Sequence, residues 1–541
     1  MTGRERVTQA ILRQPTDRIP WVPFIGCHAA QLIGASAQEY LKSEDLIVQG
    51  QQAAIDRYRP DGIPVTFDLQ IEAEVLGCDL NWADDNPPAV CKHPLANGMT
   101  LDDLSLPRPD EGRIAATLAA ARRLREANPD IALYGLITGP FTLGLHLLGT
   151  DIFMKMFDDA HGVKRLLDFC TRVAGHMADY FIDAGCDVMG VVDPMTSQIG
   201  PDAFAQFVTP GATWVFEHIR ERGALGSFFV CGHAQQNIPA MCDCKPDNIS
   251  IDENIPLQFV RDECIPRGIS FGGNMQLTTV LLLGTPVDAQ KNAIACMEIG
   301  GEEGFILAPG CDLPYATPQE NLAAVIEVVE DEYRRDVVRS MAAETPADAR
   351  LDMRDYGEAD KVVVDIVTLD SEACAPCQYM VDAVRKVAPQ FEGIVEWREH
   401  KIKYRESLVF MTSLMVRNVP TICIDGRITF VSRIPPRDEL IAAIQKRINE
   451  KFRTRIQKRK ASFYIFGKPE DTGEVEQRVR TAITELGAEM TVNVIHDEDK
   501  MFSYGIAPVQ TPAVVLARYQ MKSMKVIPES NIIREWIKDL M

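Results

Sequence analysis

Short apolar runs alternate with longer amphipathic stretches from residue 1 to about residue 340. In the longer stretches, such as Arg113–Ala127 and Ala160–Ala184, apolar residues recur at the three- to four-residue spacing of helices. This alternation, at this length, predicts an α/β fold, a (β/α)8 barrel of the TIM type over residues 1–342. The eight expected strands are Trp21–Ile25, Gly62–Phe67, Ala132–Leu136, Asp187–Val192, Ser227–Val230, Asn248–Ile251, Ile269–Gly273 and Gly304–Leu307.

Polar and sulfur-containing residues follow many of the expected strands. In such a barrel these positions face the C-terminal mouth, where the chemistry takes place. A lone aspartate there is equally typical of a turn or a helix cap, and both interpretations stay open. We assign Asp193 and Asn274 to cofactor binding on this basis. The full set is Cys27, His28, Asp68, Asp193, Cys231, Asp252, Asn274 and Cys311.

The pattern changes after residue 342. A charged, Ala- and Pro-containing linker is expected over residues 343–360, followed by a strand–helix–strand–helix–strand–strand–helix order over 361–450. This segment carries Cys374-Ala-Pro-Cys377 at a predicted helix start, and Val419-Pro420 before a later strand. It resembles a thioredoxin-type domain. The resemblance implies that the bond before Pro420 is cis and that this proline lies against the dithiol.

The last part of the chain repeats this plan. Residues 510–516 parallel residues 418–424, but Gly467-Lys-Pro-Glu470 stands where the cysteines would be. We therefore expect a second thioredoxin-like domain over 462–541, without a dithiol and suited to docking or packing. The basic run at 451–461 is interpreted as a solvated linker, with an anion-binding patch as the alternative.

Composition narrows the function classes. The chain has 541 residues, a net charge of −21 and 14 cysteines, with a pI near 5.0. An acidic chain is a poor nucleic-acid binder. The polar N-terminus predicts no signal peptide, and no stretch approaches the 18 or so apolar residues of a membrane span. A reducing cytoplasm is therefore expected, with most cysteines as small buried apolar residues.

Cys374 and Cys377 form the spacing of a redox dithiol. At a helix N-terminus the dipole and free N–H groups lower the pKa of the first thiol, so Cys374 is expected to attack and Cys377 to resolve the mixed disulfide. The alternative is half of a structural metal site. No second cysteine pair lies at suitable spacing for that, which favours redox chemistry.

Cys231 and Cys311 suggest a second sulfur chemistry, because zinc prefers thiolate and imidazole ligands. They are too distant in sequence for a zinc finger and can meet only where strand ends converge, as at a barrel mouth. His233 is two residues beyond Cys231 and is the candidate third ligand. The alternative is two buried cysteines and a surface histidine.

Eight short stretches between Arg4 and Glu332 match the pattern of one known family. They are Arg4–Val7, Asp17–Pro20, Gly139–Thr142, Val230–Gly232, Gly272–Asn274, Leu283–Pro286, Ile306–Pro314 and Thr317–Asn321. Through these stretches the region resembles the uroporphyrinogen decarboxylase superfamily, and within it the cobamide-dependent methyltransferases of the methylcobamide:coenzyme M type. The resemblance implies a barrel. It also implies a zinc held by a His-x-Cys pair and a distant Cys, which activates a thiol as methyl acceptor.

Two departures from the family pattern matter. The decarboxylases have an arginine-rich early loop, whereas Phe24–His28 contains no arginine, so porphyrinogen decarboxylation is not expected. The methyltransferases have a histidine two positions before the first cysteine, where this chain has Phe229. Either His233 replaces it, or His28 or Glu72 does, or the metal is weak or absent.

We therefore expect a corrinoid-dependent methyltransferase that moves a methyl group between a corrinoid protein and a small thiol or methylated substrate at a zinc site. No Asp-x-His-x-x-Gly motif is present, so the corrinoid belongs to a partner. The dithiol would protect the barrel cysteines by reducing them if they formed a disulfide, or it would act on substrate. A third role would be to pass electrons from a thioredoxin reductase-like or low-potential donor to the corrinoid partner. The alternative is a thiol–disulfide oxidoreductase whose barrel is a degenerate recognition module; a third hypothesis is a non-catalytic scaffold that docks a corrinoid protein.

Overall fold

The computed structural model describes residues 1–341, 356, 361–372, 374–416, 418–460, 462–516 and 520–538. Apart from Tyr356, the predicted linker at 343–360 lies outside these residues. The chain forms two compact units, Met1–Leu440 and Ile441–Met541. The barrel region and the Cys374–Cys377 segment therefore share one unit. None of the described helices combines the length and apolarity needed to cross a membrane.

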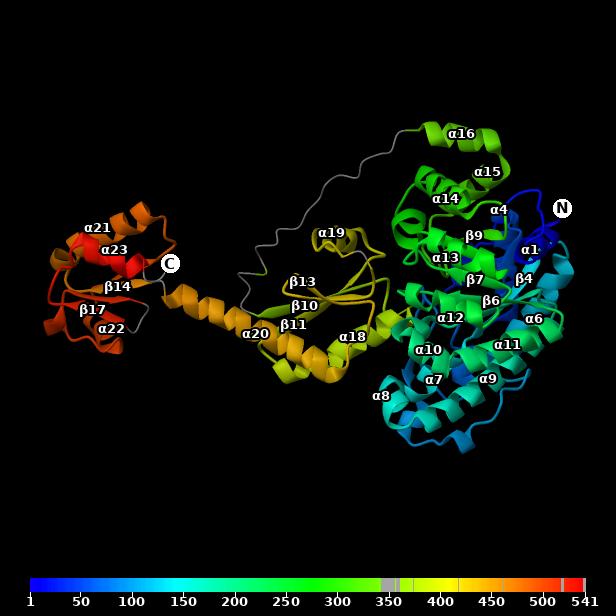
Figure 1. The fold of residues 1–541 in the computed structure, drawn as a ribbon, viewed down its shortest axis with the longest axis horizontal. Helices are drawn as coiled ribbons and strands as arrows, with labels where there is room; N and C mark the ends of the chain where they lie inside the picture. Colours follow the sequence, from blue (N-terminus) through cyan, green and yellow to red (C-terminus); the bar gives the residue numbers. More distant parts are fainter. Residues whose placement is uncertain are drawn as a thin grey trace. The chain divides into compact units, whose positions relative to one another are not determined.

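Seven parallel strands form the central sheet of the first unit (Figure 1). They pair in chain order, and the curled sheet is consistent with a TIM-type barrel. A separate hairpin of β2 (Asp79–Asn81) and β3 (Ala89–Lys92) lies outside it. The seven strands are β1 (Gly62–Pro64), β4 (Ala132–Thr138), β5 (Val188–Val192), β6 (Leu225–Val230), β7 (Asn248–Ile251), β8 (Ser270–Met275) and β9 (Phe305–Pro309).

The expected first strand, Trp21–Ile25, is reduced to a single bridge between Trp21 and Leu307. The Val22 N–H donates to the Leu307 carbonyl, and the Asp61 N–H donates to the Trp21 carbonyl. This short segment therefore lies between β9 and the start of β1 and closes the ring. Pro20 and Pro23 flank it in the sequence, and prolines lack the N–H that a longer ladder requires.

Helices connect and surround these strands (Figure 1). Their starts follow ordinary capping rules: α14 begins with a Thr285–Asp288 capping box and a proline at its first turn. The helices are α1 (Gly3–Ile11), α2 (His28–Leu32), α3 (Ala37–Leu41), α4 (Glu44–Tyr58), α5 (Ile71–Val75), α6 (Gly112–Ala127), α7 (Pro140–Leu148), α8 (Asp151–Asp158), α9 (Ala160–Asp183), α10 (Pro201–Phe207), α11 (Thr209–Glu221), α12 (Ile238–Asp243), α13 (Leu257–Cys264), α14 (Pro286–Gly300), α15 (Gln319–Glu330) and α16 (Glu332–Ser340).

The Cys374–Cys377 segment forms a four-stranded sheet with strand order β11-β10-β12-β13. β10 runs parallel to β11 and antiparallel to β12, and β12 runs antiparallel to β13. We call residues 361–436 of this unit the dithiol module. Its elements are β10 (Val362–Thr368), α18 (Ala375–Val387), β11 (Val395–Lys401), α19 (Arg405–Ser413), β12 (Thr421–Ile424) and β13 (Arg427–Val431).

The second unit repeats this sheet with order β15-β14-β16-β17 and the same strand directions. The helix α20 (Arg437–Lys460) runs through most of the predicted linker at 451–461, because that stretch is rich in Lys and Arg, which favour helix. The boundary between the two units lies between Leu440 and Ile441, in the first turns of α20. The remaining elements are β14 (Phe463–Phe466), α21 (Pro469–Leu486), β15 (Val492–Ile495), α22 (Glu498–Ser503), β16 (Ala513–Leu516), β17 (Gln520–Met524) and α23 (Ser530–Lys538).

Candidate active site

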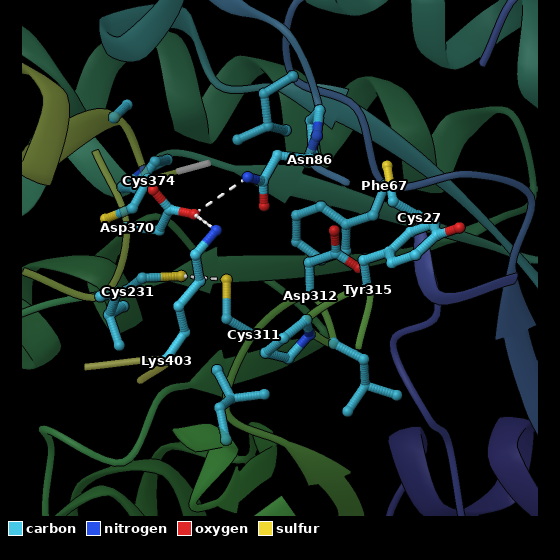
Figure 2. A pocket seen from close by; sticks show the side chains of 18 of the residues that line it. Cys27, Phe67, Asn86, Cys231, Cys311, Asp312, Tyr315, Asp370, Cys374 and Lys403 are labelled. Atoms are coloured by element: carbon cyan, nitrogen blue, oxygen red, sulfur yellow. Dashed lines mark hydrogen bonds and ion pairs between the residues drawn. The ribbon is translucent and has the colours of Figure 1, made fainter. Parts of the chain in front are cut away.

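Cys231 and Cys311 meet at the C-terminal mouth of the barrel. Cys231 directly follows β6, and Cys311 follows β9 after Gly310. Their Sγ atoms are 3.0 Å apart, and Figure 2 shows them pointing toward each other. A Cβ at Gly310 would lie 2.9 Å from the Glu253 nitrogen and 3.0 Å from Asp252 Cα, both backbone atoms, so glycine allows this close approach of the chain. The ends of β6 and β9 thus bring Cys231 and Cys311 together, as the barrel topology predicts.

The thiol pair lines a cavity of about 150 Å³. Residues of both the barrel and the dithiol module line this cavity (Figure 2). Cys374 lines it as well, so the two sulfur centres share one cavity. The barrel contributes Cys27, Phe67, Asn86, Cys231, Asp252, Cys311, Asp312 and Tyr315, and the module contributes Leu369, Asp370, Cys374, Ala375, Pro376 and Lys403, among others.

Polar contacts hold the module over the barrel mouth. The Asn86 amide donates to Asp370 at 3.0 Å, and Lys403 forms an ion pair with the same carboxylate at 2.6 Å. On α18, Gln378 donates to the Val90 carbonyl at 2.6 Å. The Tyr379 ring also packs into the barrel's core cluster. The α18 face that follows the dithiol is therefore fixed against the barrel.

Buried acidic groups surround the thiol pair. Burial raises the pKa of Asp252 to about 6, against hydrogen bonds from the Gly232 N–H and from Asn254. Burial, with the neighbouring charge of Asp252, raises the pKa of Glu253 to about 8. The hydrogen bond between Cys231 and Cys311, together with burial, raises the pKa of Cys231 well above its usual range, and the pKa of Cys311 is raised as well. Both sulfurs of the pair are therefore thiols near neutral pH unless a base takes the proton.

The dithiol lies at the start of α18, with Cys374 at the N-cap position and half-buried. Cys377 is fully buried. Burial and a hydrogen bond with Cys374 raise the pKa of Cys377 well above its usual range. The Val419–Pro420 bond is cis, as the resemblance implied. The geometry leaves Cys374 as the accessible thiol of the pair.

His233, the predicted third metal ligand, does not join the cysteines. It is exposed, and among the described residues no three His, Cys, Asp or Glu side chains are grouped so that they could hold a metal ion. The reason is local: β6 ends at Val230, and Gly232, with φ of +85°, turns the backbone before His233.

The side chains at the other candidate ligand positions are engaged in other contacts. Phe229 is buried and packs edge-on against Phe24 and Phe67, with ring centroids 5.0 and 5.7 Å away. The His28 ring nitrogens contact the Tyr58 hydroxyl and the Tyr315 carbonyl. Glu72 accepts from the N–H and hydroxyl of Thr138. The site thus offers two sulfur ligands and an aromatic cluster, which does not fit a zinc held by three protein ligands.

Asp193 and Asn274, expected to bind a cofactor, do not line the cavity. The Asp193 carboxylate accepts from the N–H groups of Phe141 and Thr142 and caps α7. The Asn274 amide donates to the carbonyls of Asp252 and Ile255. Both side chains therefore hold loops at the barrel mouth. For Asp193 this agrees with the alternative interpretation of a strand-end aspartate as a turn or helix-cap residue.

The structure adds Asp312, Asn86, Asp370 and Lys403 to the residues chosen from the sequence. Asp370 and Lys403 each come two residues after a strand of the module, so the strand-end rule would have found them if applied beyond the barrel. Asp312 adjoins Cys311 in the longest matching stretch. Asn86 lies in an irregular loop after β2, where no sequence pattern marks it.

Comparisons with known proteins concern the barrel. Methylcobamide:CoM methyltransferase MtbA of Methanosarcina acetivorans is 26% identical over 333 residues, which cover 60% of this chain and 97% of the relative. MtaA of Methanosarcina barkeri, also named a methylcobamide:CoM methyltransferase, is 27% identical over 342 residues, 61% and 98% of the two chains. A methylated-thiol–coenzyme M methyltransferase of Methanosarcina mazei is 25% identical over 344 residues, 61% and 90%.

A solved structure agrees on the fold. A methyltransferase from Methanosarcina mazei superposes with a TM-score of 0.57 at 23% identity, over 62% of this chain and 99% of that one. The family described as uroporphyrinogen decarboxylase (URO-D) matches residues 2–332, more than half of the chain. The chain therefore belongs to the uroporphyrinogen decarboxylase (URO-D) family.

Proposed function

We propose that this chain transfers a methyl group between a corrinoid carried by a separate protein and a thiol-type acceptor bound at the barrel mouth. The observation that carries the proposal is that Cys231 and Cys311 converge in a cavity of a barrel that aligns with nearly the whole length of methylcobamide:CoM methyltransferases. The corrinoid of the partner would supply or accept the methyl group.

The residues of the chain would bind the acceptor and manage its proton. Phe67 and Leu277 give the cavity apolar walls that limit water around the reacting sulfur. Asp252 lies beside the thiol pair and, with a pKa of about 6, is ionised at neutral pH. It can therefore take the proton of an acceptor thiol, whose thiolate is the nucleophile.

Zinc was expected at Cys231, Cys311 and His233, but only the two cysteines lie together. Because Phe229 occupies the family's histidine position and His233 is exposed, we route no step through a metal. The nucleophile would instead be generated by a carboxylate base, an arrangement that differs from the metal-activated thiol implied by the resemblance.

Thiol–disulfide exchange at Cys374 and Cys377 is a second candidate activity. It is supported by a half-buried cysteine at the N-cap of α18 and by a sheet whose order and directions match the thioredoxin-like plan. A thioredoxin reductase-like or other low-potential donor would recycle the dithiol. The second unit repeats the sheet without the dithiol and suits docking rather than electron transfer.

The two activities can be measured side by side. Loss of methylcobalamin in the presence of coenzyme M, under strictly reducing conditions, tests methyl transfer; reduction of insulin disulfides tests the dithiol. Asp252→Asn should impair the first and Cys374→Ser the second. No methylcobalamin loss with coenzyme M or other small thiols, in a protein that reduces insulin, would leave only the oxidoreductase.

A further inference from the structure

Cysteines from two thiol pairs line the same cavity. Cys231 and Cys311 belong to the barrel, and Cys374 belongs to the module with Cys377 directly behind it. A methyl-transfer site requires only one of these pairs. The arrangement therefore raises the question of what the second pair does there.

The barrel pair is placed to form a disulfide. Its Sγ atoms are 3.0 Å apart, about 1 Å more than a covalent S–S bond of ~2.05 Å. Both cysteines are half-buried rather than enclosed, so a reagent in the cavity can reach them. No third ligand among the described residues joins them to hold a metal in place of the bond.

The module presents Cys374 to this pair. Cys374 lies on the same side of the cavity as Cys231 (Figure 2), and its charge is among the causes that raise the Cys231 pKa. The loop before the dithiol is fixed by the ion pairs of Asp370 with Lys401 and Lys403 and by the hydrogen bond from Asn86. The attacking thiol is therefore held at the cavity without a domain movement.

We propose that Cys231 and Cys311 form a reversible disulfide and that the Cys374–Cys377 dithiol of the same chain reduces it. The proposal rests on the proposed thiol–disulfide exchange activity of the module but not on methyl transfer. It names the substrate of that activity: a disulfide inside the chain's own barrel.

The exchange balances in two steps. The Cys374 thiolate attacks Cys231, so that a Cys374–Cys231 bond forms, the Cys231–Cys311 bond breaks and Cys311 leaves as a thiolate that takes up a proton. Cys377 then loses its proton and attacks Cys374, which forms the Cys374–Cys377 disulfide and releases Cys231. Two electrons have moved from the module to the barrel. A disulfide or peroxide oxidant makes the barrel disulfide, and an external dithiol reductant restores the module.

The consequence is a barrel whose reactive thiols depend on the redox state of the module. Oxidation would convert both barrel thiols into a disulfide, which cannot react as a thiol, and the Cys374–Cys377 dithiol would reduce it again. This would suit a site whose activity requires free thiols.

The barrel contains a matched control pair. Cys242 and Cys264 have Sγ atoms 3.9 Å apart, but both are buried and neither lines the cavity. They should take no part in exchange with Cys374, although they are also close to each other. Cys423 provides a buried control within the module.

Trapping the mixed disulfide tests the proposal. The full-length Cys377→Ser variant is treated with diamide, an azo oxidant that takes two electrons and two protons from a thiol pair, and its disulfides are mapped by non-reducing peptide mass spectrometry. We expect Cys374 linked to Cys231 or Cys311, in excess of any link to Cys242 or Cys264 by about tenfold or more. Cys423→Ser in the same background should leave the link unchanged.

Three outcomes would overturn the relay. One is a Cys231–Cys311 disulfide that forms and persists beside a free Cys374. Another is the absence of any Cys231–Cys311 or mixed disulfide in oxidised protein that remains folded. The third is a link to Cys231 or Cys311 no more abundant than links to the control pair. Insulin reduction by the wild-type chain, measured separately, distinguishes failure of the relay from failure of the module's exchange activity.

Discussion

The Asn86 amide donates to the Asp370 carboxylate across 3.0 Å and thereby joins a loop of the barrel to the segment that precedes the dithiol. Asp370 is almost fully buried and also pairs with Lys401 and Lys403. One carboxylate therefore organises the module side of the shared cavity, and its removal should loosen the dithiol over the barrel.

Asp370→Asn should destabilise the module by about 3 kcal/mol, because it removes the buried counter-charge of two partly buried lysines and leaves them only the exposed carboxylates of Glu372 and Asp85. Hydrogen–deuterium exchange over residues 374–416 would report the loss. Asp382→Asn breaks only an exposed pair with Arg385 on α18 and should cost at most about 1 kcal/mol. Equal protection in the two variants would show that Asp370 does not organise this region.

The same carboxylate predicts a pH dependence. Burial tends to raise the pKa of Asp370, but the ion pairs with Lys401 and Lys403 outweigh it and lower the folded-state value. The stabilisation is therefore complete above the unfolded pKa of about 3.9 and is lost as the pH falls through the lower folded value. When the free energy of unfolding of the module is measured at decreasing pH, the difference between wild type and Asp370→Asn should narrow below about pH 4. A difference that grows as the pH falls would show that folding raises the pKa of Asp370 rather than lowering it.

Phe229→His should create a zinc site that the wild type lacks. Positions 229 and 231 lie two apart on or just after β6, so their side chains share a face, and the imidazole would join the two thiols. Elemental analysis without chelator should find zinc well below one per chain in wild type and near one in the variant. Phe229→Leu keeps an apolar side chain and is the control. Stoichiometric zinc in wild type, lost in Cys231→Ser, would contradict our interpretation of the aromatic cluster.

Asp252→Asn should slow methyl transfer by about 100-fold, the lower range for loss of a general base. The matched control is Asp193→Asn: both carboxyls are buried with a pKa of about 6, but only Asp252 lines the cavity. Rates per folded protein, with folding checked by circular dichroism, should fall only for Asp252→Asn. Equal rates for the two variants would remove Asp252 from the proton path.

Gly310→Ala should separate the barrel thiols. An added Cβ would meet Glu253 Oε2 at 2.3 Å, the Glu253 nitrogen at 2.9 Å and Asp252 Cα at 3.0 Å. Two of these are backbone atoms, so the chain itself must move, with an overpacking cost of about 1–3 kcal/mol. Diamide should then form less Cys231–Cys311 disulfide. Gly200→Ala, with open space around its Cβ, should leave the yield unchanged; an unchanged yield in Gly310→Ala would contradict the prediction.

The order of the barrel strands and the local chemistry follow from the amino-acid sequence alone. Alternating apolar runs located all seven strands of the barrel sheet, and a proline-bounded segment explains why the eighth became a bridge. The Cys-x-x-Cys motif lies at a helix start, as predicted, because N-cap position and helix propensity are properties of a few adjacent residues.

Packing in three dimensions determines which strand-end residues share the cavity. Cys231, Asp252 and Cys311 face it, whereas Asp193 and Asn274 turn to cap and brace loops, and His233 is carried outward by Gly232. Side-chain direction at a strand end depends on where the neighbouring loops leave donors and space, and spacing along the chain does not encode this. The presence of Cys374 and Cys231 at one cavity likewise depends on packing between the barrel and the module, which no local pattern specifies.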